Sequence, residues 1–233
     1  IHGGGADLQF PHHENEIAQS EACFGCQFVK YWLHAEHLLV DHKKMSKSLG
    51  NFYTLRDLLD KGYTGHEVRY MLLQTHYRTQ LNFTLQGLDA ARFSLQRLHD
   101  FVFRLENASG QGTAPASFLP AFEEYLADDF NISGALSVLF DFIRDTNSLI
   151  DQGKIGPNEA SHILSLLKKV DKVLGVIFLP PPEVPPHLEE LLQKRVQARK
   201  EKNFAEADKM RDALLLEGYL IEDTPTGARL KKK

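Results

Sequence analysis

Residues 44 to 48 read Lys-Met-Ser-Lys-Ser and combine two positive charges with two small hydroxyls. Lysine supplies a compact point charge and serine an adaptable donor, and together these groups suit the grip of a triphosphate. Gly50 frees the backbone where the segment ends. An apolar run from Leu38 to Val40 precedes it, so the order is strand and then loop. We predict a mobile loop that closes over ATP, against the alternative of a solvated basic turn. The residues expected on the phosphates are Lys44, Ser46, Lys47 and Ser48.

A second polar cluster opens the chain as Ile-His-Gly-Gly-Gly-Ala-Asp-Leu. Three glycines after a strand end let the backbone approach a ligand closely. Asp7 then offers a carboxylate to an amine or to ribose hydroxyls. Such a turn is weak as a signal by itself, because similar turns are common in loops.

The segment Phe-Pro-His-His-Glu-Asn-Glu follows, and its proline suits the first turn of a helix beginning at Pro11. On that helix His12 and Glu16 fall at i and i+4, so an imidazole and a carboxylate can converge on one metal ion. His13 is expected to point elsewhere. A surface hydrogen bond between His12 and Glu16 is the alternative. The sequence excludes a His-Glu-x-x-His protease helix, because its second histidine is absent.

The glycine turn, the proline, the paired histidines and the Lys-Met-Ser-Lys-Ser loop, in this order, closely resemble the cysteinyl-tRNA synthetases, a class I aminoacyl-tRNA synthetase family. The resemblance covers essentially the whole chain. It implies a cytoplasmic, monomeric ligase that activates cysteine with ATP and magnesium to cysteinyl-adenylate. The cysteinyl group then passes to the 3′ end of tRNA-Cys.

The resemblance also implies roles for residues. The family's zinc ion is held by two cysteines, a histidine and a glutamate, of which the last two match His12 and Glu16. Zinc binds the thiolate of substrate cysteine, a contact that serine cannot reproduce. Lys47 and Lys44 would act on the phosphates as the catalytic lysines. The residues implied at the adenylate are Gly5, Ala6, Asp7 and Leu38.

Other parts of the family's site belong upstream of Ile1, namely its HIGH motif and both zinc cysteines. The chain starts without an initiator methionine or a targeting segment. We therefore expect a C-terminal part of the enzyme that carries about half of the active site and is inactive alone. Cys23 and Cys26 form a C-x-x-C, but structural zinc needs four ligands and no second pair exists. They are interpreted as ordinary reduced thiols of a cytosolic protein.

Composition fits a soluble intracellular protein. The 233 residues include 42% hydrophobic ones, enough for real cores, and no apolar run approaches the length of a membrane span. The net charge of -4 does not indicate nucleic-acid binding. The negative net charge is only weak evidence against tRNA binding, because such binding needs a local basic surface rather than a positive net charge.

The predicted fold is an α/β remnant of a Rossmann-like class I catalytic domain, followed by a mainly α-helical bundle and a small C-terminal α+β module. Four parts are expected. Residues 1–54 hold the nucleotide-binding part with its loop, and residues 55–110 a helical region that contacts the tRNA stem. Residues 118–179 form a DALR-like bundle on the anticodon side, and residues 187–233 a small anticodon-recognition module.

Periodicity and caps place the elements. Strands are expected near 28–33 and 38–40, and short helices begin at Leu55 and near His66. A long helix runs from about Thr84 to Glu106, and a flexible linker follows at 107–117. Later helices are expected near 118–127, 132–151, 157–176, 187–202 and 203–217, with a stiff proline spacer at 180–186 and short strands at 219–221 and 229–231. The stripe predicted to be buried on the long helix is Leu88, Phe93, Leu95, Leu98, Val102 and Leu105.

Two further segments carry open alternatives. Tyr77 and Arg78 lie in a stretch that resembles the family's segment on the inner side of the tRNA, but packing with a surface ion pair explains them equally well. Asp128 and Asp129 resemble a catalytic carboxylate pair. A helix-capping turn is favoured there, because Asn131 also suits a helix start.

The terminal module is rich in basic residues with acidic ones between them, so a solvated helix face remains an alternative to RNA binding. It departs from the family at Leu230, where an aromatic residue is common, and this puts a base-stacking contact there in doubt. The basic residues are Lys194, Arg195, Arg199, Lys200, Lys202, Lys209, Arg211 and Arg229.

Two other functions stay open: a tRNA-binding chain without catalysis, and the cysteine ligase of mycothiol synthesis, which shares both N-terminal motifs. The helical bundle and the terminal module disfavour the second, because elements on the anticodon side serve no purpose there.

Overall fold

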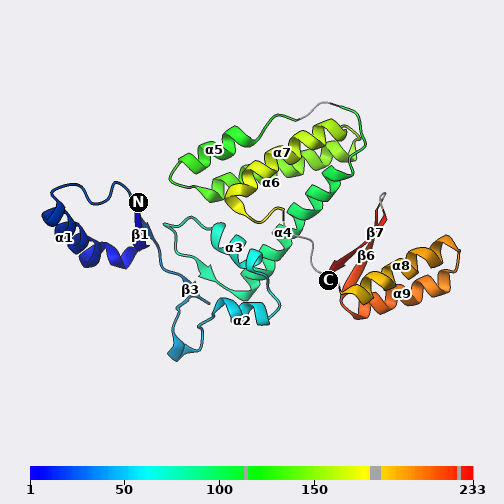
Figure 1. Ribbon diagram of the computed structural model, residues 1–233, viewed down its shortest axis with the longest axis horizontal. Helices are drawn as coiled ribbons and strands as arrows, with labels where there is room; N and C mark the ends of the chain where they lie inside the picture. The colour runs from blue at the N-terminus through cyan, green and yellow to red at the C-terminus, as the bar shows by residue number, and fades with distance from the viewer. Residues whose placement is uncertain (113–114, 179–184, 225–226, 233) are drawn as a thin grey trace. The chain divides into compact units, whose positions relative to one another are not determined.

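The computed structural model describes residues 1–112, 115–178, 185–224 and 227–232 (Figure 1). The chain divides into two compact units, residues 1–178 and residues 179–233. Each unit is described by itself.

The first unit begins with a strand–helix–strand segment. β1 (His2–Gly5) pairs in parallel with β2 (Trp32–Ala35), and α1 (Glu14–Phe24) lies between them in sequence. A 3-10 turn at Ala6–Leu8 and a π-type turn at Gln9–His13 lead into α1. The regular α-helix therefore starts later than the predicted Pro11, because the π-type turn extends to His13.

The strand predicted near 28–33 is β2, displaced toward the C-terminus. The amide of Phe28 donates to Glu21 Oε1 over 3.1 Å, and the Gln27 side chain donates to the carbonyl of Val29 over 3.1 Å. These bonds hold the residues after α1 in an irregular turn, so extended pairing begins only at Trp32.

A small mixed sheet follows, with strand order β4-β3-β5. β3 (Leu39–Val40) and β4 (Lys43–Lys44) form an antiparallel hairpin, and β5 (Asn82–Phe83) pairs with β3 in parallel. The hairpin turn places Asp41 at φ 49° and His42 at φ 61°, and two consecutive positive φ angles match the twist of a two-residue hairpin loop. The strand predicted at 38–40 is confirmed as β3, whereas β5 was not foreseen.

Three helices start at threonine caps. These are α2 (Leu55–Asp60), α3 (Gly65–Leu73) and α4 (Leu85–Glu106). Thr54, Thr64 and Thr84 each accept a hydrogen bond from an amide in the first helical turn. Each cap satisfies a backbone donor that the helix itself leaves without a partner. The predicted starts of these helices are therefore confirmed within about one residue.

The helical bundle adds α5 (Leu119–Ala127), α6 (Ile132–Asp151) and α7 (Pro157–Leu174), and Figure 1 shows α6 and α7 running beside α4. One prediction within α4 is wrong: Phe93 is 66% exposed. It lies roughly 140° round the helix from Leu88, whereas Ala91 and Phe101 fall on the buried side. The bundle core includes Leu95, Leu98, Leu105, Phe122, Leu139, Ile143, Ile163, Leu167 and Val170.

The segment predicted as a flexible linker is tied to the bundle at two positions. The amide of Gly110 donates to the carbonyl of Ile155, and that of Gln111 to the carbonyl of Gly153, each over 2.9 Å. The two backbones approach so closely that a Cβ at Gly110 would collide with the carbonyl of Gly153. The linker interpretation is therefore wrong for these two residues.

The second unit contains α8 (Pro186–Lys200), α9 (Phe204–Leu216) and an antiparallel hairpin of β6 (Tyr219–Thr224) and β7 (Gly227–Lys232). Its helices and strands confirm the predicted α+β module, and both strands are longer than expected. The predicted proline spacer lies largely outside the described residues. In the described part of the chain, no helix has both the length and the apolar character that a membrane span needs.

Candidate active site

The lysine-rich loop leaves β4 and closes on itself. Residues Lys47–Leu49 form a single 3-10 turn, and Ser46 caps it by accepting from the amide of Ser48 over 3.2 Å. The hydroxyls of Ser46 and Ser48 lie 2.6 Å apart. Gly50 ends the turn at φ 66°, a conformation that favours glycine. The two hydroxyls predicted to face phosphate are thus brought together.

Asn51 organises this loop, a role that was not predicted from the sequence. Its side-chain oxygen accepts from the amide of Ser46 over 2.9 Å. Its side-chain nitrogen donates to the carbonyl of Lys44 over 3.1 Å and approaches that of Val40 at 3.4 Å. One amide side chain therefore joins both ends of the loop to β3. An asparagine directly after a left-handed glycine is a signal that could have pointed to it.

The predicted catalytic lysines are exposed. Lys47 Nζ lies 5.6 Å from the centre of the Phe52 ring, and no carboxylate neutralises Lys44 or Lys47 among the described residues. Phe52 thus supports the Lys47 side chain without cancelling its charge. Both lysines are free to meet an anionic ligand.

The glycine turn is as tight as its composition predicts. A Cβ at Gly5 would collide with Asp7 Oδ1, and one at Gly4 would lie 2.9 Å from Leu8 Cδ1. The Asp7 carboxylate is exposed, with His37 Nε2 at 3.8 Å. Leu38 lies half-buried immediately before β3. Gly5, Asp7 and Leu38 thus lie on separate segments, and their contacts with an adenylate stay a prediction.

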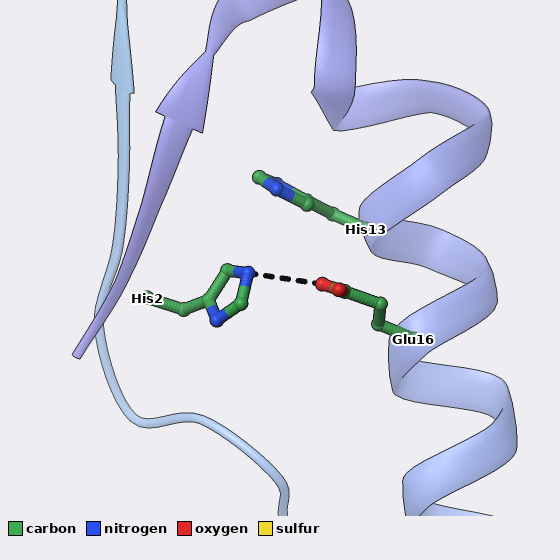
Figure 2. Close-up of side chains that lie close together, drawn as sticks. All are labelled: His2, His13 and Glu16. Atoms are coloured by element: carbon green, nitrogen blue, oxygen red, sulfur yellow. Dashed lines mark ion pairs between the residues drawn. The ribbon is translucent and has the colours of Figure 1, made fainter.

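The nearby polar cluster consists of His2, His13 and Glu16, shown in Figure 2. One ligand atom from each lies within 4.8 Å of the others. His2 comes from β1, His13 from the turn before α1, and Glu16 from the first turn of α1. Glu16 Oε2 lies 3.0 Å from His2 Nε2, while His12 Nε2 lies 3.4 Å from the other carboxylate oxygen.

The expectation that His13 points away from Glu16 is wrong. On a helix surface residues three apart are neighbours just as residues four apart are, so both histidines can reach the carboxylate. His13 is also the most buried residue of this region, at 2% exposure, whereas the His12 side chain is 61% exposed. The predicted pair of His12 and Glu16 is adjacent in the structure, but His13 is the histidine inside the cluster.

β2 supplies the partners that hold His13. Its Nδ1 lies 2.8 Å from His34 Nε2, and its ring packs 5.0 Å from the ring of Trp32. Burial lowers the pKa of His13 below the ordinary value for histidine, and positive charge on His2 lowers it further. The imidazole is therefore kept neutral, the form that binds a metal ion. Trp32 and His34 alternate on one strand, which is the only sequence signal for this contact.

The donor set of the cluster fits zinc. Glu16 Oε2 is buried, and it has an ion-pair contact with His2 Nε2 at 3.0 Å but no hydrogen bond. A buried carboxylate oxygen without a donor is costly unless a cation satisfies it. Imidazole nitrogens with one carboxylate are ordinary zinc ligands. Cys23 and Cys26 are free and exposed and do not join the cluster, in agreement with their interpretation as ordinary thiols.

Comparisons with known protein families match successive segments of the chain. Residues 1–93 match the family model for the class I (C) tRNA synthetase catalytic domain, and residues 121–179 match the DALR domain. Residues 181–229 match the cysteinyl-tRNA ligase anticodon binding domain. The chain belongs to the cysteinyl-tRNA ligase family.

Curated relatives of this chain support the same family assignment. A cysteine–tRNA ligase of Protochlamydia amoebophila is 56% identical over 241 residues, which cover 100% of this chain and 50% of that protein. One of Chlamydia felis is 54% identical, with 100% of this chain and 51% of that protein covered. The chain therefore spans about half the length of the curated relatives that it matches.

The fold has a counterpart among solved structures. A leucyl-tRNA synthetase of Agrobacterium radiobacter, solved in a ternary complex with tRNA and LeuAMS, matches with a TM-score of 0.55 at 20% identity. The match covers 76% of this chain and 26% of that one. It confirms the predicted fold class, the C-terminal part of a class I synthetase catalytic region joined to a helical bundle.

Proposed function

We propose that this chain supplies part of a cysteine–tRNA ligase, which activates cysteine with ATP and transfers it to tRNA-Cys. The observation that carries the proposal is the Glu16 carboxylate, of which one oxygen is buried. It lies among imidazoles and retains an oxygen that accepts no hydrogen bond. A site for a thiophilic metal beside a triphosphate-binding loop matches the selection of an amino acid thiol followed by its activation with ATP.

The lysine-rich loop acts in the activation step. As the amino acid carboxylate attacks the α-phosphate of ATP, negative charge grows on the departing pyrophosphate. Lys47 and Lys44 neutralise it, and the hydroxyl groups of Ser46 and Ser48 donate hydrogen bonds to phosphate oxygens. Magnesium accompanies ATP as its counter-ion.

The glycine turn holds the adenylate. Gly5 lets the backbone lie directly against the Asp7 carboxylate, which accepts from an amine or a ribose hydroxyl, and the backbone of Gly5 and Ala6 contacts the adenylate. The backbone of Leu38 contacts the adenine. These roles come from the family resemblance and agree with the exposure of Asp7.

Glu16 is one proposed zinc ligand and His12 is the other from this chain. When bound, zinc supplies a soft Lewis acid that favours a thiol over a hydroxyl. His2 and His13 surround the carboxylate and limit how it can rotate. The family resemblance implies that the remaining ligands and the rest of the ATP site fall in the part of the relatives' length that this chain does not span.

The helical parts are proposed to bind tRNA. This is supported by the DALR domain match at residues 121–179 and by the match to an anticodon binding domain at residues 181–229. A tRNA-binding chain without catalysis remains the second candidate. It rests on the two matches that follow the catalytic one.

Lys47 gives the experiment that separates these candidates. In an enzyme of the relatives' full length that carries this chain, Lys47→Ala is expected to slow cysteine-dependent ATP–pyrophosphate exchange by about 10²–10³-fold with the KM for cysteine nearly unchanged. Lys43→Ala is the matched control, because Lys43 is equally exposed one residue before Lys44 on β4. A normal rate with a raised KM for cysteine in Lys47→Ala would reject the assignment.

A further inference from the structure

A ten-residue connection between α3 and α4, Gln74–Phe83, contacts two separate parts of the first unit. On one side it meets the turn between α5 and α6. The Asp129 carboxylate there accepts from the Tyr77 hydroxyl over 2.6 Å and pairs with Arg78 Nε at 2.7 Å. The carbonyl of Asp129 lies 2.9 Å from His76 Nε2. The Tyr77 hydrogen bond and the charge of Arg78 lower the pKa of Asp129, so its carboxylate is ionised.

On its other side the connection meets the segment that leads into the lysine-rich loop. The carbonyl of Tyr77 accepts from the amide of Glu36 over 2.8 Å, and the carbonyl of Leu81 accepts from Leu39 over 2.8 Å. Farther along, the amide of Asp41 donates to the carbonyl of Phe83 over 3.1 Å. The strand before the loop is therefore held along the length of the connection.

The turn that carries Asp129 adopts an uncommon backbone conformation. Asp129 has φ 50° and its neighbour Phe130 has φ 56°, both in the left-handed region without being glycine. Phe130 is 59% exposed, so burial of its ring does not account for this conformation. Strained residues persist where surrounding contacts hold them. Backbone hydrogen bonds within the turn, from the amide of Phe130 to the carbonyl of Leu126 and from that of Asn131 to the carbonyl of Tyr125, act here together with the contacts of Asp129 with the connection.

We propose that Asp129 is a positioning residue for the lysine-rich loop, acting through Tyr77 and the connection onto the strand that precedes the loop. The contact joins residues matched by two different family models, since Tyr77 falls in the catalytic match and Asp129 in the DALR match. A shift of the α5–α6 turn thus moves the backbone of β3. That strand pairs with β4 and so positions Lys44. The importance of this position for catalysis rests on the proposed function of the loop.

Hydrogen–deuterium exchange of the full 233-residue chain, without ATP or tRNA, tests the linkage. Asp129→Asn removes the charge but keeps a residue that tolerates the left-handed conformation. We expect roughly three- to ten-fold faster exchange of the amides of Glu36, Leu39 and Asp41 and of the loop 43–52, because local opening governs exchange and the lost ion pair is partly exposed. Exchange in α7 is expected to stay unchanged, which excludes general unfolding.

Two further variants make the result specific. Asp128→Asn alters the adjacent carboxylate, whose side chain makes no such contact with the connection, and is expected to leave exchange at 36–52 unchanged. Tyr77→Phe removes only the hydroxyl and is expected to reproduce the acceleration in weaker form. If Asp129→Asn fails to fold, Tyr77→Phe tests the proposal in its place.

Faster exchange confined to 74–79 and 128–133, with 36–52 unchanged in both Asp129→Asn and Tyr77→Phe, would overturn the proposal. The readout needs no substrate, so this outcome would leave the proposed ligase function standing. Conversely, a failed pyrophosphate-exchange test on Lys47 would leave the linkage standing and remove only its catalytic meaning.

Discussion

Residues 1–60 and residues 64–178 are stabilised in different ways. Only three residues of the first range are buried, namely His13, Val40 and Leu58. The second range contains nearly all of the hydrophobic core of its unit. The chemistry-bearing groups of the first range are held by side-chain hydrogen bonds and histidine contacts, whereas the helices of the second are held by apolar burial.

The contrast also shows in what remains exposed. Phe10, Phe24 and Tyr31 lie on the segment that carries the polar cluster of the candidate site. Their exposed fractions are 78%, 76% and 66%. The site therefore takes little of its stability from its own residues. Hydrogen bonds from Leu39 and Asp41 to the segment before α4 connect it to the region that has a core.

The largest expected effect is on the bundle core. Leu139→Ala should reduce the free energy of unfolding by about 3–5 kcal/mol, because Leu139 has 0% exposure and its removal leaves a cavity. Phe10→Ala, in the other region, should change it by less than about 0.5 kcal/mol. Urea denaturation followed by circular dichroism measures both. Comparable losses in the two variants would contradict the contrast.

A buried carboxylate within the helical region gives the next effect. Glu67 has 7% exposure, caps α3 through the amide of Thr64 at 2.7 Å, and pairs with Arg92 Nε at 2.7 Å. Glu67→Gln should cost about 2 kcal/mol, since a desolvated charged acceptor is lost and Arg92 keeps part of its hydration. Urea denaturation is again the measurement.

The control for Glu67 is an exposed ion pair on α6. Asp141→Asn breaks the pair with Arg144, whose side chains are 59% and 66% exposed. Solvent screens such pairs, so no measurable loss is expected. Equal losses of the free energy of unfolding in Glu67→Gln and Asp141→Asn would show that burial does not determine how much a carboxylate contributes to stability.

The smallest effect concerns pH. His99 on α4 is half-buried beside the carbonyl of Val176 at 3.3 Å, and burial lowers its pKa below the ordinary 6.5. The unfolded chain therefore binds a proton first as the pH falls, so stability declines below about pH 6.5 until the folded pKa is reached. His99→Gln should flatten this part of the profile between pH 7 and 5. An unchanged slope would contradict the assignment to His99.

Local signals made most of the helical region predictable. Thr54, Thr64 and Asn131 are caps that act within three residues, and their helices start where the sequence indicates. The role of Asp129 was not predictable, because its partner Tyr77 is 52 residues away in the sequence.

The candidate site also contains contacts that local sequence signals predict and contacts that they do not. The loop from Lys44 to Ser48 and the adjacency of His12 and Glu16 follow from short spacings. The place of His13 depends on His34, a contact over 21 residues between separate segments. Pairings across the fold set such contacts, and no local periodicity encodes them.

Metal content tests the central claim, that the polar N-terminal region selects cysteine through zinc. In an enzyme of the relatives' full length that carries this chain, we expect one zinc ion per chain after chelator dialysis. Glu16→Gln should lose it, because a carboxylate ligand is removed, while Glu14→Gln, altered on the same helical turn but exposed, should retain it.

The same measurement on the 233-residue chain alone should find no stoichiometric zinc, since zinc affinity depends on the number of ligands and on thiolate donors. Full zinc occupancy in the Glu16→Gln enzyme would contradict the account, as would one tightly held zinc ion in the isolated chain. Loss of zinc in Glu16→Gln alone, with Glu14→Gln unaffected, is the result that the account predicts.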